Sequence, residues 1–198
     1  MTFKVNNYSI IKNAVSSEIA DFAYEYLLLK RQVCKTLLDT TYISPFNKYF
    51  GEWEDSQVPN TYSIYGDVAM ETLLMKVKPL MEKETGLNLI PTYAYARIYK
   101  RGDVLKKHVD RPSCKISTTM NLGGEKWPIY LKTDKVVKVE LSPGDMLIYS
   151  GCELEHWREP FEGENCGQVF LHYNDLDTQG DENRFDRRLH LGLPFDVK

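Results

Sequence analysis

Residues 141–160, LSPGDMLIYSGCELEHWREP, join a turn, a short apolar run and a histidine within one stretch of the chain. Pro143 and Gly144 are strong turn formers, and the run from Met146 to Ser150 has the length and composition of a buried strand. The stretch therefore predicts a strand that follows a tight turn and brings His156 just beyond its end.

A second stretch, residues 95–110, has the same order of features: YARIYKRGDVLKKHVD. The alternation of large and small side chains from Thr92 to Tyr99 predicts a strand, and Gly102 marks the turn after it. Similar patterns predict strands at 116–122, 127–132, 136–141 and 168–173. Several short strands at regular spacing are typical of an antiparallel sandwich or barrel.

The residues before this region have a different pattern. Residues 3–12 predict a short leading strand, and Ser16 and Ser17 offer the cap of a helix. Residues 40–65, rich in Tyr, Pro, Asn and Gly, predict an irregular loop. The apolar face of the capped helix is expected to consist of residues at helical spacing, namely Ile19, Phe22, Tyr26 and Leu29.

A second helix is expected to begin near Asp67 and to stop at Gly86, with Pro79 kinking it or weakening its last turns. Its predicted apolar face consists of Met70, Leu73, Leu74, Val77, Leu80 and Met81. With two helices before the strands, we expect a mostly β domain with flanking α-helices that brace one sheet from outside.

The chain of 198 residues is long enough for one domain with a substantial core. We predict a single domain over 1–198, with helical support to residue 88, a β core at about 89–175 and a charged tail at 176–198. The segment from Asp177 to Arg188 is expected to be a mobile loop or a lid.

The composition argues against several classes of partner. Lys plus Arg (25) against Asp plus Glu (28) gives a net charge of −3, which provides no electrostatic drive toward nucleic acid or an anionic membrane. No apolar run is long enough to span a bilayer, and the N-terminus lacks a signal-peptide pattern. We expect a cytoplasmic protein whose cysteines, Cys34, Cys114, Cys152 and Cys166, are free thiols.

Three side chains near the predicted strand ends form a candidate metal site. His108 and Asp110 lie two residues apart, so strand alternation projects both toward the same side. His156 comes from a distant segment that must fold back to meet them. Two histidines and one carboxylate suit ferrous iron, because this set leaves one face of the metal open. We predict that these three residues bind one iron ion and form the catalytic centre.

Taken with their surroundings, the two quoted stretches resemble the Fe(II)/2-oxoglutarate-dependent dioxygenases, and specifically their prolyl 4-hydroxylase-like branch. The resemblance covers roughly residues 90–175 and implies a double-stranded β-helix, the cupin-like jelly roll. It implies Fe(II), 2-oxoglutarate as co-substrate and dioxygen, with metal roles for His108, Asp110 and His156. It also implies that Tyr99 faces the co-substrate.

The chain departs from this family at one position. The family usually has a Lys or Arg about ten residues after the last histidine, where it pairs with the distal carboxylate of 2-oxoglutarate. Here residues 164–168 are ENCGQ, without a basic side chain. We expect Arg158 to replace it, because two residues after His156 an extended chain faces the same side. Gln168 and Tyr99 are expected to add hydrogen bonds, and Arg97 is the second candidate cation.

Other interpretations of these residues remain open at this point. Arg158 is instead a surface residue if it pairs with Glu155 or Glu159. His172, on the inward side of the last strand, is interpreted as a core histidine rather than a pocket residue, and His190 as solvated.

For the function, we expect hydroxylation of a C–H bond in a peptide or protein, by resemblance a prolyl residue. The loop near 40–65 and the charged tail are expected to help hold this chain. The alternatives are a hydroxylase of a free amino acid or other small molecule, and a cupin-like metal-binding module without oxygenase activity. A nucleic-acid demethylase fits the acidic balance poorly.

Overall fold

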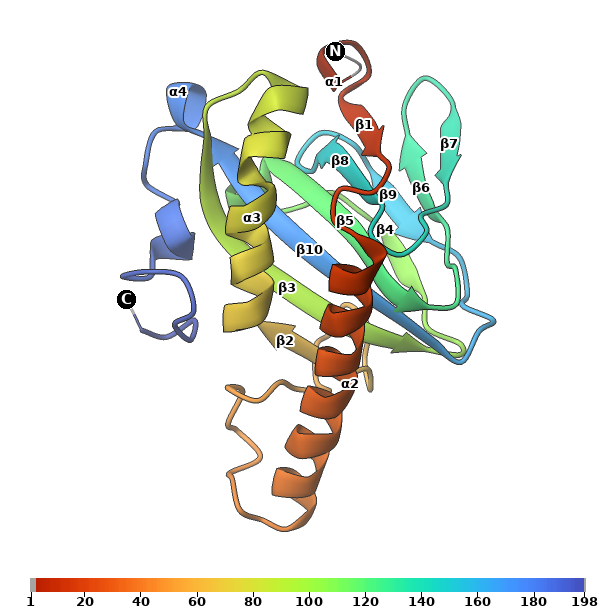
Figure 1. Cartoon of the computed structure of the whole chain (residues 1–198), viewed down its shortest axis with the longest axis vertical. Coiled ribbons are helices and arrows are strands. Elements are labelled where there is room, and N and C mark those ends of the chain that lie inside the picture. Colours follow the sequence, from red (N-terminus) through yellow and green to blue (C-terminus); the bar gives the residue numbers. More distant parts are fainter. Residues whose placement is uncertain (1–2, 198) are drawn as a thin grey trace.

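The computed structural model describes residues 3–197, and its architecture is two antiparallel sheets braced by two long helices on one side (Figure 1). The larger sheet has the strand order β1-β8-β5-β10-β3-β2, and the smaller has the order β4-β9-β6-β7. This arrangement confirms the predicted jelly roll with flanking helices. The outer limits of the predicted domain, residues 1 and 198, lie outside the described residues.

The strands of the larger sheet are β1 (Tyr8–Ile11), β2 (Ser63–Tyr65), β3 (Leu89–Lys100), β5 (Ile116–Gly124), β8 (Met146–Ser150) and β10 (Asn165–Asp175). Those of the smaller sheet are β4 (Leu105–His108), β6 (Ile129–Lys132), β7 (Val136–Val139) and β9 (His156–Arg158). The helices are α1 (Phe3–Asn6), α2 (Ser17–Asp39), α3 (Val68–Thr85) and α4 (Leu176–Gln179), with short 3-10 turns η1 (Pro112–Cys114) and η2 (Arg184–Arg187).

The long and central strands of the larger sheet, β3, β5, β8 and β10, are buried on both faces, but the two faces differ in chemistry. Along β10, Val169, Leu171 and Tyr173 belong to the main apolar core beneath α2 and α3. The alternate residues, among them Gln168 and His172, face the smaller sheet. The same alternation in β3 and β5 gives the inner face its polar side chains, which include Tyr93, Arg97, Tyr99, Ser117 and Thr119. The polar inner face is where the candidate site lies.

Helix α3 matches the prediction closely. Asp67 caps its first turn by accepting hydrogen bonds from the amides of Ala69 and Met70, and Gly86 ends it in the left-handed conformation (φ 69°). Of the predicted apolar face, every residue but the half-buried Leu80 is buried. The helix continues through Pro79 to Thr85, and Pro79 lies on its exposed side.

Helix α2 begins at the predicted cap, Ser16, but its predicted apolar face is only half right, since Ile19 and Tyr26 pack against the core and the other two residues do not. Phe22 and Leu29 are 70% and 65% exposed, whereas Ala20, Ala23 and Leu27 are buried. The small residues on the buried face of α2 are explained by two glycines in the neighbouring strands β5 and β10. A Cβ atom at Gly123 or Gly167 would lie within 2.6 Å of the Tyr24 ring, so this helix packs unusually close to the sheet. A close approach favours alanine over large side chains.

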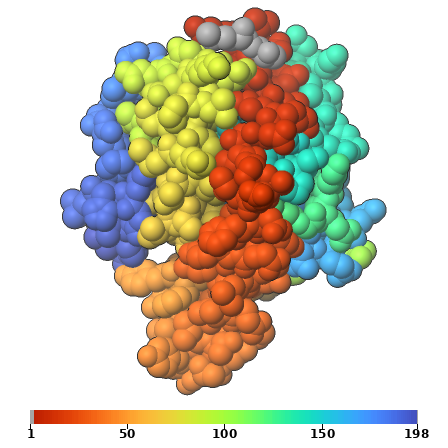
Figure 2. Space-filling view, viewed as in Figure 1, coloured from red at the N-terminus to blue at the C-terminus, as the bar shows by residue number. Residues whose placement is uncertain are grey.

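Two other predictions for the first 88 residues need correction. Residues 3–12 do not form one strand, because α1 precedes β1 and Asn7 between them has a positive φ of 59°. The region before residue 88, predicted to be helical support, also contributes strands, because β1 and β2 form the two edges of the larger sheet. Residues 40–62 are irregular, as expected, and their first part forms the lower projection in Figure 2 together with the C-terminal turns of α2. Within residues 3–197, no helix is long and apolar enough to cross a membrane.

The charged tail is fastened to the body by a buried ion pair. The Arg188 guanidinium lies 2.5 Å from Glu71 of α3, and both side chains are at most 2% exposed. Arg188 also donates to the carbonyl oxygen of Leu193, and Glu71 accepts from the amide of Gly192. The part of the predicted lid around Arg188 is thus held by charge-assisted hydrogen bonds in this structure.

The contribution of the Arg188–Glu71 ion pair to stability can be measured. Replacing Glu71 with Ala leaves the Arg188 charge buried without its carboxylate, so we expect the free energy of unfolding to fall by about 3–5 kcal/mol. Asp39→Ala breaks the exposed pair with Lys35 and is the matched control, with an expected loss below about 1 kcal/mol. Urea denaturation measures both, and equal effects would contradict a structural role for the buried pair.

Candidate active site

The two histidines of the candidate metal site face each other across neighbouring strands. His108 ends β4 and His156 begins β9, and the two residues are direct partners in the antiparallel register. Their ring centroids are 4.3 Å apart. Both short strands were missed by the sequence prediction, which placed each histidine beyond the end of a strand. Their pairing is what brings together two residues far apart in the chain.

The hydrogen bonds of the two imidazoles leave the same nitrogen available on each. Nδ1 of His108 lies 2.8 Å from the carbonyl oxygen of Lys106, and Nδ1 of His156 lies 2.9 Å from that of Leu154. A carbonyl oxygen can only accept, so each Nδ1 carries the proton and each Nε2 keeps its lone pair. Burial and the neighbouring His156 lower the pKa of His108, which favours the neutral form that binds metals.

Asp110 completes the group with one carboxylate oxygen. Its Oδ1 lies 3.4 Å from Nε2 of His156 and 3.8 Å from Nε2 of His108. Its Oδ2 accepts a 2.6 Å hydrogen bond from the hydroxyl of Ser117. Burial raises the pKa of Asp110, but His156, His172 and Ser117 outweigh it and hold that pKa below its usual value. The side chain is therefore a carboxylate with Oδ1 directed at the histidines.

The three ligand atoms have the spacing that a metal site requires. They lie within 4.8 Å of one another, and no other trio of His, Cys, Asp or Glu among residues 3–197 forms such a group. Atoms bound at right angles to one metal at about 2.1 Å lie about 3 Å apart. The two separations from Asp110, 3.4 and 3.8 Å, are close to this value, so the residues present fit a divalent metal.

One contact of this site was not predicted from the sequence. The side-chain amide of Gln57 lies 3.0 Å from Nε2 of His108, the atom we assign to a metal. Gln57 belongs to the irregular segment before β2, where no pattern indicates which side chains turn inward. This bond and a metal–His108 bond use the same lone pair, so they exclude each other.

His108 and Asp110 border a cavity of about 300 Å³ on the inner face of the larger sheet. The lining of this cavity includes neither His156 nor Arg158. His172 is buried, as expected for a core histidine, and it also lines this cavity. The interpretations as a core residue and as a pocket residue are therefore compatible. Nδ1 of His172 lies 3.0 Å from the Ser117 hydroxyl, which connects it to Asp110. Burial lowers the pKa of His172 to about 4. The other walls include Asp55, Tyr93, Tyr95, Tyr149 and Phe170.

Arg158 is a buried cation without an acidic partner. It is 1% exposed, and among residues 3–197 it forms no ion pair, so the surface pairing with Glu155 or Glu159 does not occur. Its guanidinium donates to the Trp127 carbonyl oxygen and the Thr119 hydroxyl, and Nε has no hydrogen-bond partner. Burial lowers the pKa of Arg158, since no carboxylate compensates the lost hydration.

The residues predicted to assist Arg158 lie beside it. The side-chain oxygen of Gln168 accepts hydrogen bonds from Arg158 at 3.3 Å and from Thr119 at 2.9 Å. Tyr99 is 1% exposed and packs edge-on against Trp127, with ring centroids 4.7 Å apart. The Arg158 guanidinium also lies over the Trp127 ring, 5.1 Å from its centroid. Thr119 and Trp127 were not predicted as members of this group.

Arg97, the second candidate cation, already has a carboxylate partner. Its Nη2 atom lies 2.5 Å from Oδ2 of Asp55 and 3.0 Å from the Tyr95 hydroxyl. Burial opposes its charge, but Tyr99, Tyr95 and Asp55 raise the pKa of Arg97 above its usual value. Asp55 comes from the irregular loop, and its position opposite Arg97 has no signal in the sequence. Of the two arginines, Arg158 is the one without an acid.

Comparisons with known proteins agree with this architecture. No family model and no curated protein matches the sequence. A prolyl-4-hydroxylase from Pseudomonas putida has a TM-score of 0.62 at 11% identity, over 87% of this chain and 95% of that one. A prolyl hydroxylase from Trichoplax adhaerens, solved with a peptide fragment of hypoxia inducible factor, has a TM-score of 0.63 at 17% identity, over 89% and 87%.

HygX from Streptomyces hygroscopicus, solved with nickel and 2-oxoglutarate bound, has a TM-score of 0.58 at 11% identity, over 88% of this chain and 85% of that one. At these identities the likeness is one of fold. The chain has the jelly-roll fold of these enzymes, which confirms the fold that the resemblance in the sequence implied.

The assignment of the metal ligands predicts how variants bind metal. Asp110→Ala removes a charge and a ligand atom, so binding of Mn²⁺ should fall sharply. Ser117→Ala removes only the hydrogen bond that orients Asp110 and should weaken binding by about 10- to 100-fold. Isothermal titration measures both, with Asp134→Ala, at an exposed acid of the β6–β7 turn, as the control. Unchanged affinity in Asp110→Ala would rule out this site.

Proposed function

We propose that this chain is an Fe(II)- and 2-oxoglutarate-dependent dioxygenase that hydroxylates a C–H bond. The observation that carries the proposal is the combination of two features on one inner face. Two histidines and an aspartate direct three ligand atoms at one point, and a buried arginine nearby lacks an acid. A metal module without oxygenase activity would have no need of the buried cation.

The donor set fits iron better than the common alternatives. Two imidazoles and one carboxylate on one face leave the remaining positions of a divalent metal open, as in ferrous oxygenases. A structural zinc site, by contrast, has four protein ligands. When bound, ferrous iron and 2-oxoglutarate would supply an oxidant made from dioxygen, with loss of carbon dioxide and formation of succinate.

The residues of the chain would contribute geometry and electrostatics. Lys106 and Leu154 orient the imidazoles of His108 and His156 through their carbonyl oxygens. Ser117 holds one oxygen of Asp110 and leaves the other for the metal. These contacts orient the ligands before a metal arrives, so the main rearrangement on binding would be the release of Gln57 from Nε2 of His108.

Arg158 would bind the distal carboxylate of 2-oxoglutarate. The planar guanidinium can donate to both oxygens of a carboxylate, and a buried anion needs such a partner. Gln168 and Thr119 would position the guanidinium, and Tyr99 packs against the same Trp127 ring as Arg158. The Asp55–Arg97 pair makes Arg97 the weaker candidate for this role.

For the substrate, we infer a residue of a peptide or protein, with prolyl as the first candidate from the resemblance. A free amino acid or another small molecule is the alternative. The irregular segment 40–62 contributes Asp55 and Gln57 to the metal cavity, which supports a role of this segment in recognition.

The first test of this function is the co-substrate reaction. With ferrous iron, air and a substrate peptide, 2-oxoglutarate should be converted to succinate. Anaerobic mixtures should give none, because dioxygen is consumed in the reaction. Succinate formation that is independent of dioxygen or of iron would contradict the proposal.

The second test concerns Arg158. Loss of a buried charge-assisted contact to a carboxylate costs roughly 2–5 kcal/mol, so Arg158→Ala should raise the apparent Michaelis constant for 2-oxoglutarate at least about tenfold. Binding of Mn²⁺ should stay nearly intact, which also shows that the variant folds. Arg101→Ala, at an exposed arginine paired with Glu164, is the control. A Michaelis constant within about twofold of wild type would exclude Arg158 as the anchor and direct the test to Arg97.

A further inference from the structure

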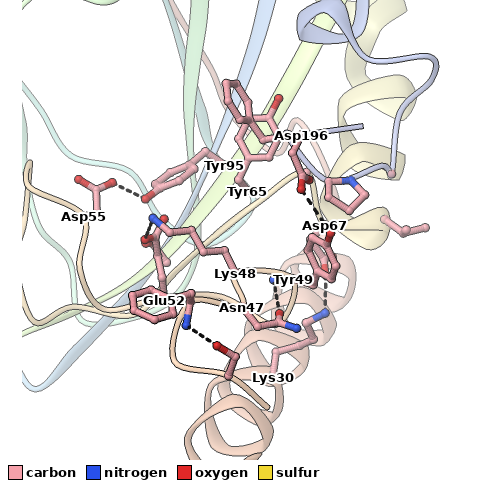
Figure 3. Close-up of a pocket in the computed structure, with 18 residues that line it drawn as sticks. Lys30, Asn47, Lys48, Tyr49, Glu52, Asp55, Tyr65, Asp67, Tyr95 and Asp196 are labelled. Carbon is pink, nitrogen blue, oxygen red and sulfur yellow. Dashed lines mark hydrogen bonds and ion pairs between the residues drawn. The ribbon is translucent and has the colours of Figure 1, made fainter. Parts of the chain in front are cut away.

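A second and larger hollow adjoins the metal cavity. This hollow, which we call the entry cleft, has a volume of about 800 Å³. One wall is the irregular segment 44–55, the opposite wall is the C-terminal segment 192–196, and β2, β3 and the start of α3 form the floor (Figure 3). Asp55 and Tyr95 line both the entry cleft and the metal cavity. Asp55 and Tyr95, which are hydrogen-bonded to each other, therefore form a boundary that the two spaces share.

The two walls of the entry cleft are fastened to the body. The hydroxyl of Tyr62 donates to the carbonyl oxygen of Phe50, and Glu52 pairs with Ser63 through backbone hydrogen bonds. The opposite wall is held through Arg188, which donates to Leu193. Walls that are already ordered reduce the entropy lost on binding, so the entry cleft is suited to a ligand.

Large aromatic side chains gather at this cleft with unusual exposure. Phe46, Tyr49 and Phe195 are 88%, 55% and 52% exposed, and Tyr65 and Tyr95 add further rings in the floor. Clustered exposed apolar side chains of this kind mark interaction sites. Aromatic faces also attract organic cations.

The charges in the entry cleft favour a cationic ligand. Three of its four acids have a cation within 3 Å: Asp67 with Lys30, Glu52 with Lys48, and Asp55 with Arg97. The fourth, Asp196, accepts a 3.4 Å hydrogen bond from the Tyr49 hydroxyl and forms no ion pair among residues 3–197. Figure 3 shows Asp196 and Tyr49 on the side away from Asp55. This carboxylate next to an aromatic ring carries the uncompensated charge of the cleft.

The size of the two spaces favours a polypeptide over a small molecule. In the proposed function the metal cavity of about 300 Å³ would already hold the iron and 2-oxoglutarate. The additional 800 Å³ has room for several residues of an extended chain, which advances about 3.3 Å per residue.

We propose that the entry cleft binds a polypeptide segment carrying a lysine or arginine, whose cationic side chain is held by Asp196 and the Tyr49 ring. A residue further along the same segment would then lie at the metal. The placement of this further residue at the metal rests on the proposed oxygenase function. The binding itself requires no turnover.

Affinity selection from a degenerate decapeptide library on the immobilised protein tests the proposal without iron. Lysine and arginine should be enriched at one position by about fivefold to tenfold, since an exposed ion pair and a cation–π contact act together. Asp196→Asn should remove most of this enrichment, and Asp134→Asn, the same change on the β6–β7 turn, should preserve it. Enrichment of neutral or acidic residues, or its survival in Asp196→Asn, would overturn the proposal.

Two variants of Tyr49 separate the ring from its hydroxyl. Tyr49→Phe keeps the aromatic face and should retain a measurable preference for lysine and arginine, whereas Tyr49→Ala should lose it. Equal preference in wild type and Tyr49→Ala would contradict the assigned role of the ring. The assay also separates this inference from the proposed function. Basic enrichment without succinate formation refutes the oxygenase alone, and succinate formation without basic enrichment refutes the cleft assignment alone.

Discussion

The cross-strand pairing of His108 with His156 is the constraint on which the rest of the site depends. Side chains of direct partners in an antiparallel pair lie on the same face, so this register places both imidazoles on the inner side of the smaller sheet. A shift of either strand by one residue would turn its histidine to the opposite face. The backbone carbonyls that accept from each Nδ1 then set the direction of both Nε2 atoms.

The polar groups on the inner face of the larger sheet lower the stability of the protein, and a bound ligand would offset this loss. A buried donor without a partner costs about 1–3 kcal/mol, and Nε of Arg158 has none in this structure. The apolar core between the helices and the outer face of the larger sheet provides the stability that tolerates such groups. The fold thus separates its two tasks by strand alternation, with stability on one face and chemistry on the other.

Much of this arrangement follows from the sequence, and the exceptions have physical reasons. The long core strands and the caps Ser16, Asp67 and Gly86 have strong local signals, and the ligand trio is recognisable from residue types near strand ends. Strands β4 and β9 are too short to show alternation, so the pairing of the histidines was not predictable. The partner of Arg97 comes from an irregular segment, and the buried face of α2 depends on glycines in distant strands. Such contacts are set by tertiary packing, which no local pattern contains.

A crystal structure of the protein prepared without oxygen in the presence of Fe(II) and 2-oxoglutarate would test the ligand and anchor assignments together. We expect an iron anomalous signal between Nε2 of His108, Nε2 of His156 and Oδ1 of Asp110, with the distal carboxylate of 2-oxoglutarate on the Arg158 guanidinium. Iron bound elsewhere, or a carboxylate that does not contact Arg158, would contradict these assignments.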